Sequence, residues 1–152
     1  MKLNLRFWGL MAILVLTLSN CSKNKDYTAI DRELIVNYLA DHNLTATEHE
    51  SGLFYIHTLE GSGGHPSPTS TITIKYKGYF LDGEVFDKTG DNQSASFYLP
   101  NLIEGWQIGI PLMKKGGKIK LFIPSRLGYG SRESGAVPAN SVLIFDIDLL
   151  EF

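Results

Sequence analysis

The sequence has one cysteine, Cys21, among 152 residues, and it has no apolar run near the length of a membrane span. A lone cysteine has no partner for an internal disulfide. The apolar stretch 7–18 has twelve residues, whereas a spanning helix needs roughly 20. Neither disulfides nor a transmembrane helix is therefore expected to organise this protein.

Positive charge is also scarce. Lys and Arg number 14 against 16 Asp and Glu, and removal of residues 1–20 would take away Lys2 and Arg6 but no acidic residue, which changes the net charge from −2 to −4. Affinity for nucleic acid depends on clustered Lys and Arg. Nucleic acid is therefore not expected as a partner, and the remaining residues suffice for one domain with its own core.

Signatures of nucleophilic, metal and nucleotide chemistry are missing as well. No Cys, Asp or Glu spacing around His42, His49, His57 and His65 fits a metal site, so these histidines are expected at the surface and no metal or other cofactor is predicted. There is no G-x-S-x-G motif. Gly117-Lys118 lacks the earlier glycine of a phosphate loop, because Leu112 stands there.

The first 21 residues have the layout of an export signal. Lys2 and Arg6 precede the apolar run, and small or polar residues lead to Cys21. The tetrapeptide L-S-N-C resembles the lipobox of bacterial lipoproteins, which implies cleavage before Cys21 and lipid, including palmitate, on its thiol and amine. A plain cleaved signal and an uncleaved anchor or buried helix are the alternatives.

Residues 27–42 have helical periodicity after a polar tether at 21–26. Ile30, Leu34 and Tyr38 lie four residues apart, and Ile35 and Leu39 widen this apolar stripe. Thr28 followed by Asp31 resembles a capping box, and Asn43 is suited to end the helix. The helix is expected to pack on the domain or to space it from the membrane; dimerisation is the alternative.

The rest of the chain reads as short strands. Segments 53–59, 71–80, 118–124 and 141–150 are apolar or alternating, and an Asp82-Gly83 two-residue turn returns the chain through Val85 and Phe86. Only residues 103–113 have a further helical pattern, and Gly105, Gly109 and Pro111 weaken it. The pattern predicts an α+β domain of antiparallel strands with one short internal helix.

Five motifs together resemble the FKBP-type peptidyl-prolyl isomerases. They are Y-K-G-Y-F-L-D-G-E-V-F-D at 76–87, L-I-E-G-W at 102–106, L-G-Y-G at 127–130, V-P at 137–138 and L-I-F-D-I-D-L-L at 143–150. The resemblance implies a curved antiparallel sheet of about five strands wrapped around the short helix. The implied organisation is a signal at 1–20, a tether at 21–26, a helical extension at 27–46 and the isomerase domain at 47–152.

The resemblance also implies a proline pocket and its residues. Tyr76, Phe86, Trp106, Val137 and Phe145 would form an apolar cup, with Leu102 and Ile103 on its rim. The Ile103 N–H would donate to the carbonyl after the proline, Tyr129 would offer its hydroxyl to a substrate carbonyl, and Asp87 would lie beside the twisting amide. Trp106 would be the floor, with Gly105 giving close access to its ring. Asp87 would act either by electrostatics or by fixing pocket side chains.

Two local features bear on this pocket. A regular hairpin would place Phe86 and Tyr76 on opposite faces of the sheet, so a bulge is predicted at Gly78. In S-A-S-F-Y-L, Ala95 stands where many relatives have an aromatic ring, so one pocket wall is expected to be thinner.

The implied function is cis-trans isomerisation of Xaa-Pro bonds in unfolded or partly folded envelope proteins. Desolvation and twisting of the amide would supply the catalysis, which explains the absence of nucleophiles. The protein would be lipid-anchored in the cell envelope, at the outer membrane or the periplasmic side of a membrane, and macrolides are a further candidate ligand class. The rival functions are a binding or chaperone module of this fold with little turnover, and a structural envelope lipoprotein without a ligand.

Overall fold

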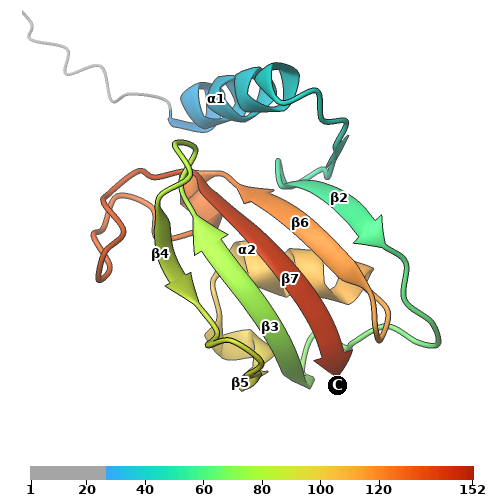
Figure 1. Cartoon of the computed structure of the whole chain (residues 1–152). Coiled ribbons are helices and arrows are strands. Elements are labelled where there is room, and N and C mark those ends of the chain that lie inside the picture. The colour runs from blue at the N-terminus through green and yellow to red at the C-terminus, as the bar shows by residue number, and fades with distance from the viewer. Residues whose placement is uncertain (1–26) are drawn as a thin grey trace, which may run out of the picture.

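The computed structural model describes residues 27–152 (Figure 1). The predicted signal at 1–20, the predicted lipidation site Cys21 and the predicted tether at 21–26 lie outside the described residues. Among the described residues, no helix has both the length and the apolar character needed to cross a membrane.

An antiparallel sheet forms the body of the protein, which confirms the α+β prediction. Its strand order is β1-β2-β6-β7-β3-β4, and β5 pairs with β3. The strands are β1 Thr47–Glu48, β2 Phe54–Leu59, β3 Thr71–Tyr79, β4 Val85–Lys88, β5 Ala95–Tyr98, β6 Lys118–Ile123 and β7 Leu143–Glu151. The helices are α1 Tyr27–Asp41 and α2 Glu104–Gly109, with 3-10 turns at Leu99–Asn101, Ile110–Leu112 and Ser125–Leu127. The short strands β1 and β5 were not predicted.

The main core lies between the sheet and α2 (Figure 1). Leu143, Phe145, Ile147 and Leu149 of β7 face it together, as the alternation of that segment predicts. The two glycines of α2 allow the helix to approach β6 closely. A Cβ added to Gly105 would lie 2.6 Å from a methyl carbon of Ile123, and one added to Gly109 would lie 2.7 Å from Leu121. Gly105 thus makes room for a strand side chain and not, as expected, for access to the Trp106 ring.

Helix α1 packs on the opposite face of the sheet. Ile35 and Leu39 are buried there against Phe54, Phe122 and other side chains that point away from α2. The predicted stripe through Ile30 and Leu34 is wrong, because these side chains are 38% and 43% exposed. The buried row is offset by one residue and runs through Asp31, Ile35 and Leu39.

A buried carboxyl group fastens α1 to the domain. Asp31 is 1% exposed, and its Oδ2 accepts hydrogen bonds from the Ser125 N–H at 2.8 Å and the Ser125 hydroxyl at 2.6 Å. The predicted capping box is therefore wrong: α1 already includes Tyr27 and Thr28, and Asp31 serves a tertiary contact. Asn43, at φ 53°, ends the helix as predicted.

The β3–β4 hairpin has a three-residue turn and not the predicted two-residue one. The Phe80 N–H donates to the Glu84 carbonyl at 2.9 Å, and Gly83 adopts φ 88°. Tyr79 then faces Val85 and Gly78 faces Asp87, so Phe86 is the extra residue of a bulge. The predicted break at Gly78 is confirmed.

Gly78 itself leaves the space that Phe86 fills. A Cβ at this position would lie 2.7 Å from Cζ of Phe86 and 2.6 Å from Cε1 of Phe145. Both distances are shorter than a normal contact, so a side chain at position 78 would force the Phe86 and Phe145 rings to move. The bulge and the missing side chain together bring the Phe86 ring to the same side of the sheet as Phe145.

Removal of the Asp31 carboxyl is expected to destabilise the protein through α1. Asp31→Ala leaves the buried N–H and hydroxyl of Ser125 without their acceptor, and the expected loss in free energy of unfolding is about 2–3 kcal/mol. Urea unfolding monitored by tryptophan fluorescence measures this loss. Asp41→Ala, at an exposed position of the same helix, is the control; equal stability of the two variants would contradict the assigned role.

Gly78→Ala is expected to cost about 1–3 kcal/mol of unfolding free energy, because the added methyl group overpacks Phe86 and Phe145. Gly64→Ala is the matched control, since a Cβ there meets no atom within 4 Å. Denaturant titration of both variants provides the comparison. A Gly78→Ala protein as stable as Gly64→Ala would show that this gap is not needed.

Candidate active site

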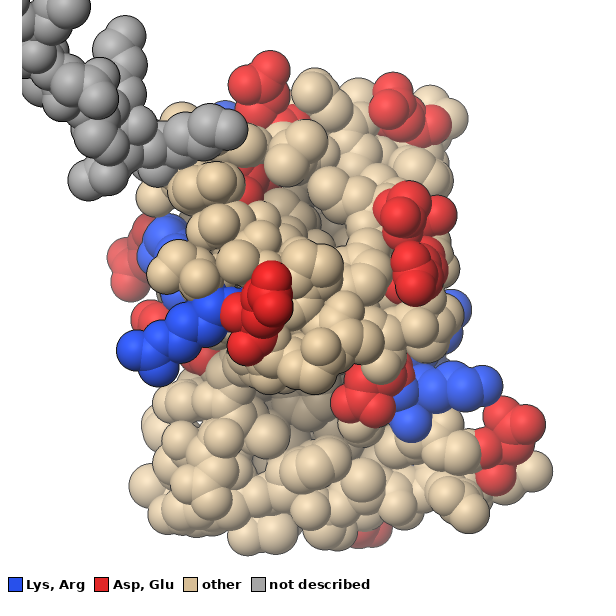
Figure 2. Space-filling model, turned by 90° about the vertical axis from the view of Figure 1, so that its left-hand side faces the viewer, with Lys and Arg blue, Asp and Glu red and all other residues tan. Residues whose placement is uncertain are grey.

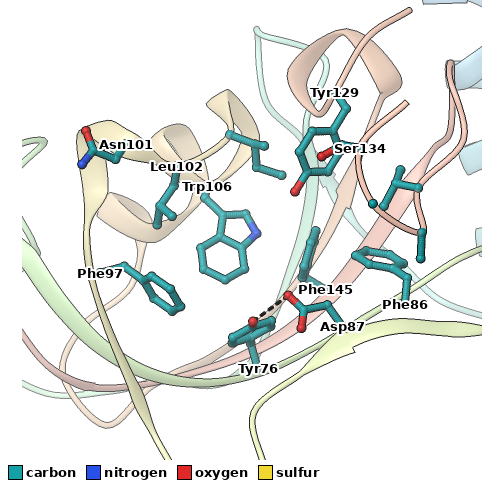
Figure 3. Close-up of a pocket in the computed structure, with 14 residues that line it drawn as sticks. Tyr76, Phe86, Asp87, Phe97, Asn101, Leu102, Trp106, Tyr129, Ser134 and Phe145 are labelled. Carbon is teal, nitrogen blue, oxygen red and sulfur yellow. Dashed lines mark hydrogen bonds between the residues drawn. The ribbon is translucent and has the colours of Figure 1, made fainter. Parts of the chain in front are cut away.

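A cavity of about 440 Å³ opens between α2, the sheet and the loop that follows β6 (Figure 3). All nine residues predicted to form the pocket line it. They are Tyr76, Phe86, Asp87, Leu102, Ile103, Trp106, Tyr129, Val137 and Phe145. Five further lining residues were not predicted: Phe97, Asn101, Ser134, Gly135 and Ala136.

The Trp106 ring lies at the base of this cavity and is 5% exposed. It contacts three other rings nearly at right angles: Phe145 at 5.0 Å, Tyr76 at 5.2 Å and Phe97 at 6.2 Å between centroids. Edge-to-face contacts of this kind are favourable and directional. The indole orientation is thus fixed by its neighbours, and its Nε1 has no hydrogen-bond partner among the described residues.

Helix α2 holds Trp106 by packing and not by helix propensity. The helix has only six residues, includes two glycines and continues into a 3-10 turn at Pro111. Gly105, Trp106 and Gly109 are all buried in it. The poor helix sequence is explained by this close contact with β6, which requires glycine where a longer side chain would clash.

Tyr76 and Asp87 form the main polar contact of the site. The Tyr76 hydroxyl donates to Oδ2 of Asp87 at 2.7 Å, as the dashed line in Figure 3 marks. Burial, and after it this hydrogen bond, raises the pKa of the Tyr76 phenol well above its ordinary value. Tyr76 therefore stays neutral and remains a donor, which holds the Asp87 carboxyl beside the cavity.

A backbone donor lies at the rim where α2 begins. Ile103 is the residue that precedes α2, at φ −59° and ψ 148°, and its N–H donates no backbone hydrogen bond within the described residues. The neighbouring segment is fixed by the Gln107 side chain, whose Nε2 donates to the Leu102 carbonyl at 2.7 Å. The free N–H of Ile103 is consequently held in a defined place.

Tyr129 approaches from the opposite rim with its hydroxyl directed into the cavity (Figure 3). The ring is 37% exposed, but its loop is well tied. Gly130 donates from its N–H to the Ser125 carbonyl at 2.8 Å, and Ser134 and Val137 exchange backbone hydrogen bonds of 2.9 Å. These bonds position both Tyr129 and the buried Val137.

Phe97 supplies an aromatic wall that was not predicted. It lies on β5, where it faces Ile72 of β3, and so points to the same side of the sheet as the core. Its ring centroid is 6.1 Å from that of Tyr76. Ala95 lies two residues earlier on the same face of β5 and does not line the cavity, so the thinner wall at Ala95 stays a prediction. The alternation of Ala95 and Phe97 with Ser96 and Tyr98 was the available signal.

The polar side-chain groups of the lining residues are three hydroxyls, one carboxyl, one amide and the indole N–H of Trp106. None of its lining residues is a cysteine or histidine. Within residues 27–152, no cluster of three or more His, Cys, Asp or Glu side chains is placed to hold a metal ion. The site can thus orient a guest amide and remove it from water.

Comparisons with known proteins agree with the architecture of this site. The family model of the FKBP-type peptidyl-prolyl cis-trans isomerase matches residues 63–150. The FKBP-type peptidyl-prolyl cis-trans isomerase FkpA of Aeromonas hydrophila is 43% identical over 102 residues, which cover 66% of this chain and 38% of that protein. FkpA of Escherichia coli strain K12 is 41% identical, with the same coverage. The chain spans about two fifths of the length of these curated relatives.

A solved structure shows the same fold. The crystal structure of FkpA from Escherichia coli superposes on this chain with a TM-score of 0.73 and 35% sequence identity. The matched region covers 83% of this chain and 59% of the FkpA chain. The family model covers more than half of the sequence and includes all the cavity-lining residues. The chain therefore belongs to the FKBP-type peptidyl-prolyl cis-trans isomerase family.

Proposed function

We propose that this protein catalyses cis-trans isomerisation of Xaa-Pro bonds in unfolded or partly folded proteins of the cell envelope. The observation that carries this proposal is the ring-lined cavity above Trp106, with hydrogen-bonding groups at its rim. A cavity of about 440 Å³ lies in the range typical of small-molecule sites and has room for a prolyl ring with its flanking peptide groups.

The chemistry requires rotation about one partial double bond. Amide resonance sets a barrier of roughly 18–20 kcal/mol, while the two Xaa-Pro isomers differ by only about 0.5–1 kcal/mol. Both isomers are therefore populated, and their exchange is slow. A catalyst has to lower the barrier without favouring either isomer strongly.

Removal of water is the proposed source of catalysis. Resonance places negative charge on the amide oxygen, and water stabilises this charge more in the planar amide than in the twisted one. Burial of a poorly paired amide costs on the order of 2–7 kcal/mol. If about 5 kcal/mol of this cost is relieved in the twisted state, the rate rises several thousandfold.

The rim groups would hold the flanking peptide in a turn that suits the twisted amide. Ile103 N–H would donate to the carbonyl after the proline, and the Tyr129 hydroxyl would donate to a second substrate carbonyl. Asp87 retains two candidate roles. Its hydrogen bond with Tyr76 supports the role of fixing pocket side chains, and its place at the mouth supports electrostatic orientation of the amide.

Loss of the rim hydroxyl is expected to slow catalysis more than it weakens the fold. Tyr129→Phe should lower kcat/KM by roughly 10-fold, and Asp87→Ala and Trp106→Ala by about 10–100-fold, since each removes a group that contacts the bound amide. Exchange NMR on a short Xaa-Pro peptide measures the rates, and circular dichroism checks that each variant is folded.

Tyr98→Phe is the matched control, because Tyr98 is similarly exposed but does not line the cavity. If the cis-trans exchange rate of the peptide stays at its uncatalysed value with the wild type and with every variant, the proposed isomerase activity is wrong. Peptide binding without turnover would then identify a binding or chaperone module. A macrolide that enters the cavity would compete in the same assay.

The location that fits these clients is the cell envelope, with the chain anchored through lipid on Cys21. The support is the L-S-N-C sequence after a basic and apolar leader. The domain would then act on proteins that reach it on the outer-membrane or periplasmic side.

Cys21→Ser is expected to move the protein from the detergent phase to the aqueous phase in Triton X-114 partition, and to abolish incorporation of labelled palmitate. Ser22→Ala is the control and should retain both properties. Detergent partition and labelling that are unchanged in Cys21→Ser would exclude the proposed anchor.

A further inference from the structure

A second hollow lies next to the proline pocket, between α1 and the turn of the β3–β4 hairpin. It is a groove of about 430 Å³ with an apolar lining that includes Leu34, Phe80, Leu81, Pro138 and Val142. Leu34 is 43% exposed although it is a leucine on a packed helix. Neither the fold nor the proposed chemistry accounts for this groove.

The groove and the pocket share a wall. The ring of Phe80 lines the groove, the ring of Phe86 lines the pocket, and their centroids are 4.8 Å apart. On the other side, Val137 lines the pocket and the next residue, Pro138, lines the groove. A chain that leaves the pocket over this wall would enter the groove directly.

The direction of a bound client follows from the two ends of the pocket. If the Ile103 N–H takes the carbonyl after the proline, the chain that follows the proline leaves beside Leu102 and α2. Phe86 and Asp87 lie at the other end of the pocket (Figure 3). The residues before the Xaa-Pro bond would thus pass Phe86 and reach the groove.

Charge adds a second preference. Asp82 and Glu84 lie at the rim of the groove, and none of its lining residues is basic. The side of the molecule that carries β4 and the loop after β6 shows more acidic than basic side chains around its tan, uncharged surface (Figure 2). Opposite charge on a partner would be favoured here, although exposed charges contribute modestly to affinity.

We propose that this groove binds the client segment that precedes the Xaa-Pro bond. The segment is extended, with an apolar side chain seated against Leu34 and Leu81 and a basic side chain beside Asp82 or Glu84. Phe80 and Phe86 are in ring contact, and an extended chain advances about 3.4 Å per residue, so the residues just before the proline can cross this wall and place the apolar side chain in the groove. The inference rests on the proposed binding of Xaa-Pro in the neighbouring cavity, and it makes the groove a determinant of client choice.

Three peptides with one Xaa-Pro core test the proposal on the full chain. The first is the short core, the second adds about five residues before the core, with one Leu and one Lys among them, and the third adds the same residues after the core. The extension before the core is expected to raise kcat/KM about fivefold over the short peptide, from partial burial of one leucine side chain. The extension after the core should give no such gain.

Leu34→Ser and Leu81→Ser should each reduce this gain to less than about twofold while the short peptide reacts at the wild-type rate. Val36→Ser is the matched control, since Val36 is 39% exposed on the same helix but does not line the groove. Glu84→Gln should lower kcat/KM only for the peptide whose lysine precedes the core.

Equal gains from both extensions, or a gain that survives Leu34→Ser and Leu81→Ser, would overturn the proposal. A dimer detected by sedimentation would also overturn the proposal if Leu34→Ser dissociates it without changing the peptide preference. A second copy of the chain would then occupy the groove. If the short peptide is not turned over at all, the proposed activity fails instead. In that case, NMR titration tests binding to the groove, by comparing the affinities of the same three peptides.

Discussion

The site depends on the close contact between α2 and β6. Gly105 and Gly109 leave room for Ile123 and Leu121, so the helix lies nearer to the sheet than side chains at these positions would permit. This contact compensates for weak helix propensity and places Trp106 at the base of the cavity, where Phe145, Tyr76 and Phe97 meet it edge to face. The same packing that completes the core therefore makes the floor of the pocket.

The hairpin of β3 and β4 provides the opposite wall by a second local irregularity. A regular ladder would send Phe86 to the other face of the sheet, where α1 packs. The bulge opposite Gly78 returns this ring to the cavity and leaves Asp87 in reach of the Tyr76 hydroxyl. Glycine is again the enabling residue, here because two aromatic rings occupy the place of its missing side chain.

The sequence allowed the fold class and most of the site to be predicted, for identifiable reasons. Alternating residues in β3 and β7 and the order of five motifs were enough for the sheet, the short helix and the nine lining residues. The bulge was predicted because two residues assigned to one pocket could not otherwise share a face. The conflict between a regular hairpin register and the placing of Tyr76 and Phe86 in one pocket thus led to a correct prediction of the bulge.

The failures were tertiary in origin. Asp31 looked like a capping residue, but a buried contact with Ser125 uses its carboxyl and turns α1 by one position, so that Ile30 and Leu34 face outward. Phe97 was missed because a four-residue strand carries little periodic signal. Asn101 ends a short 3-10 turn, and Ser134, Gly135 and Ala136 lie in a loop; these segments carry no periodic signal, and the Ser134–Val137 hydrogen bonds that shape the loop form only in the fold.

The proposed mechanism changes the environment of an amide and transfers no proton. The most direct test is exchange NMR of one Xaa-Pro peptide with a catalytic amount of the protein, in H₂O and in D₂O. The account predicts that the protein-bound peptide undergoes cis-trans exchange on the order of a thousandfold faster than the free peptide, at nearly equal rates in both solvents. Exchange at the free-peptide rate, or a rate severalfold lower in D₂O, would contradict it.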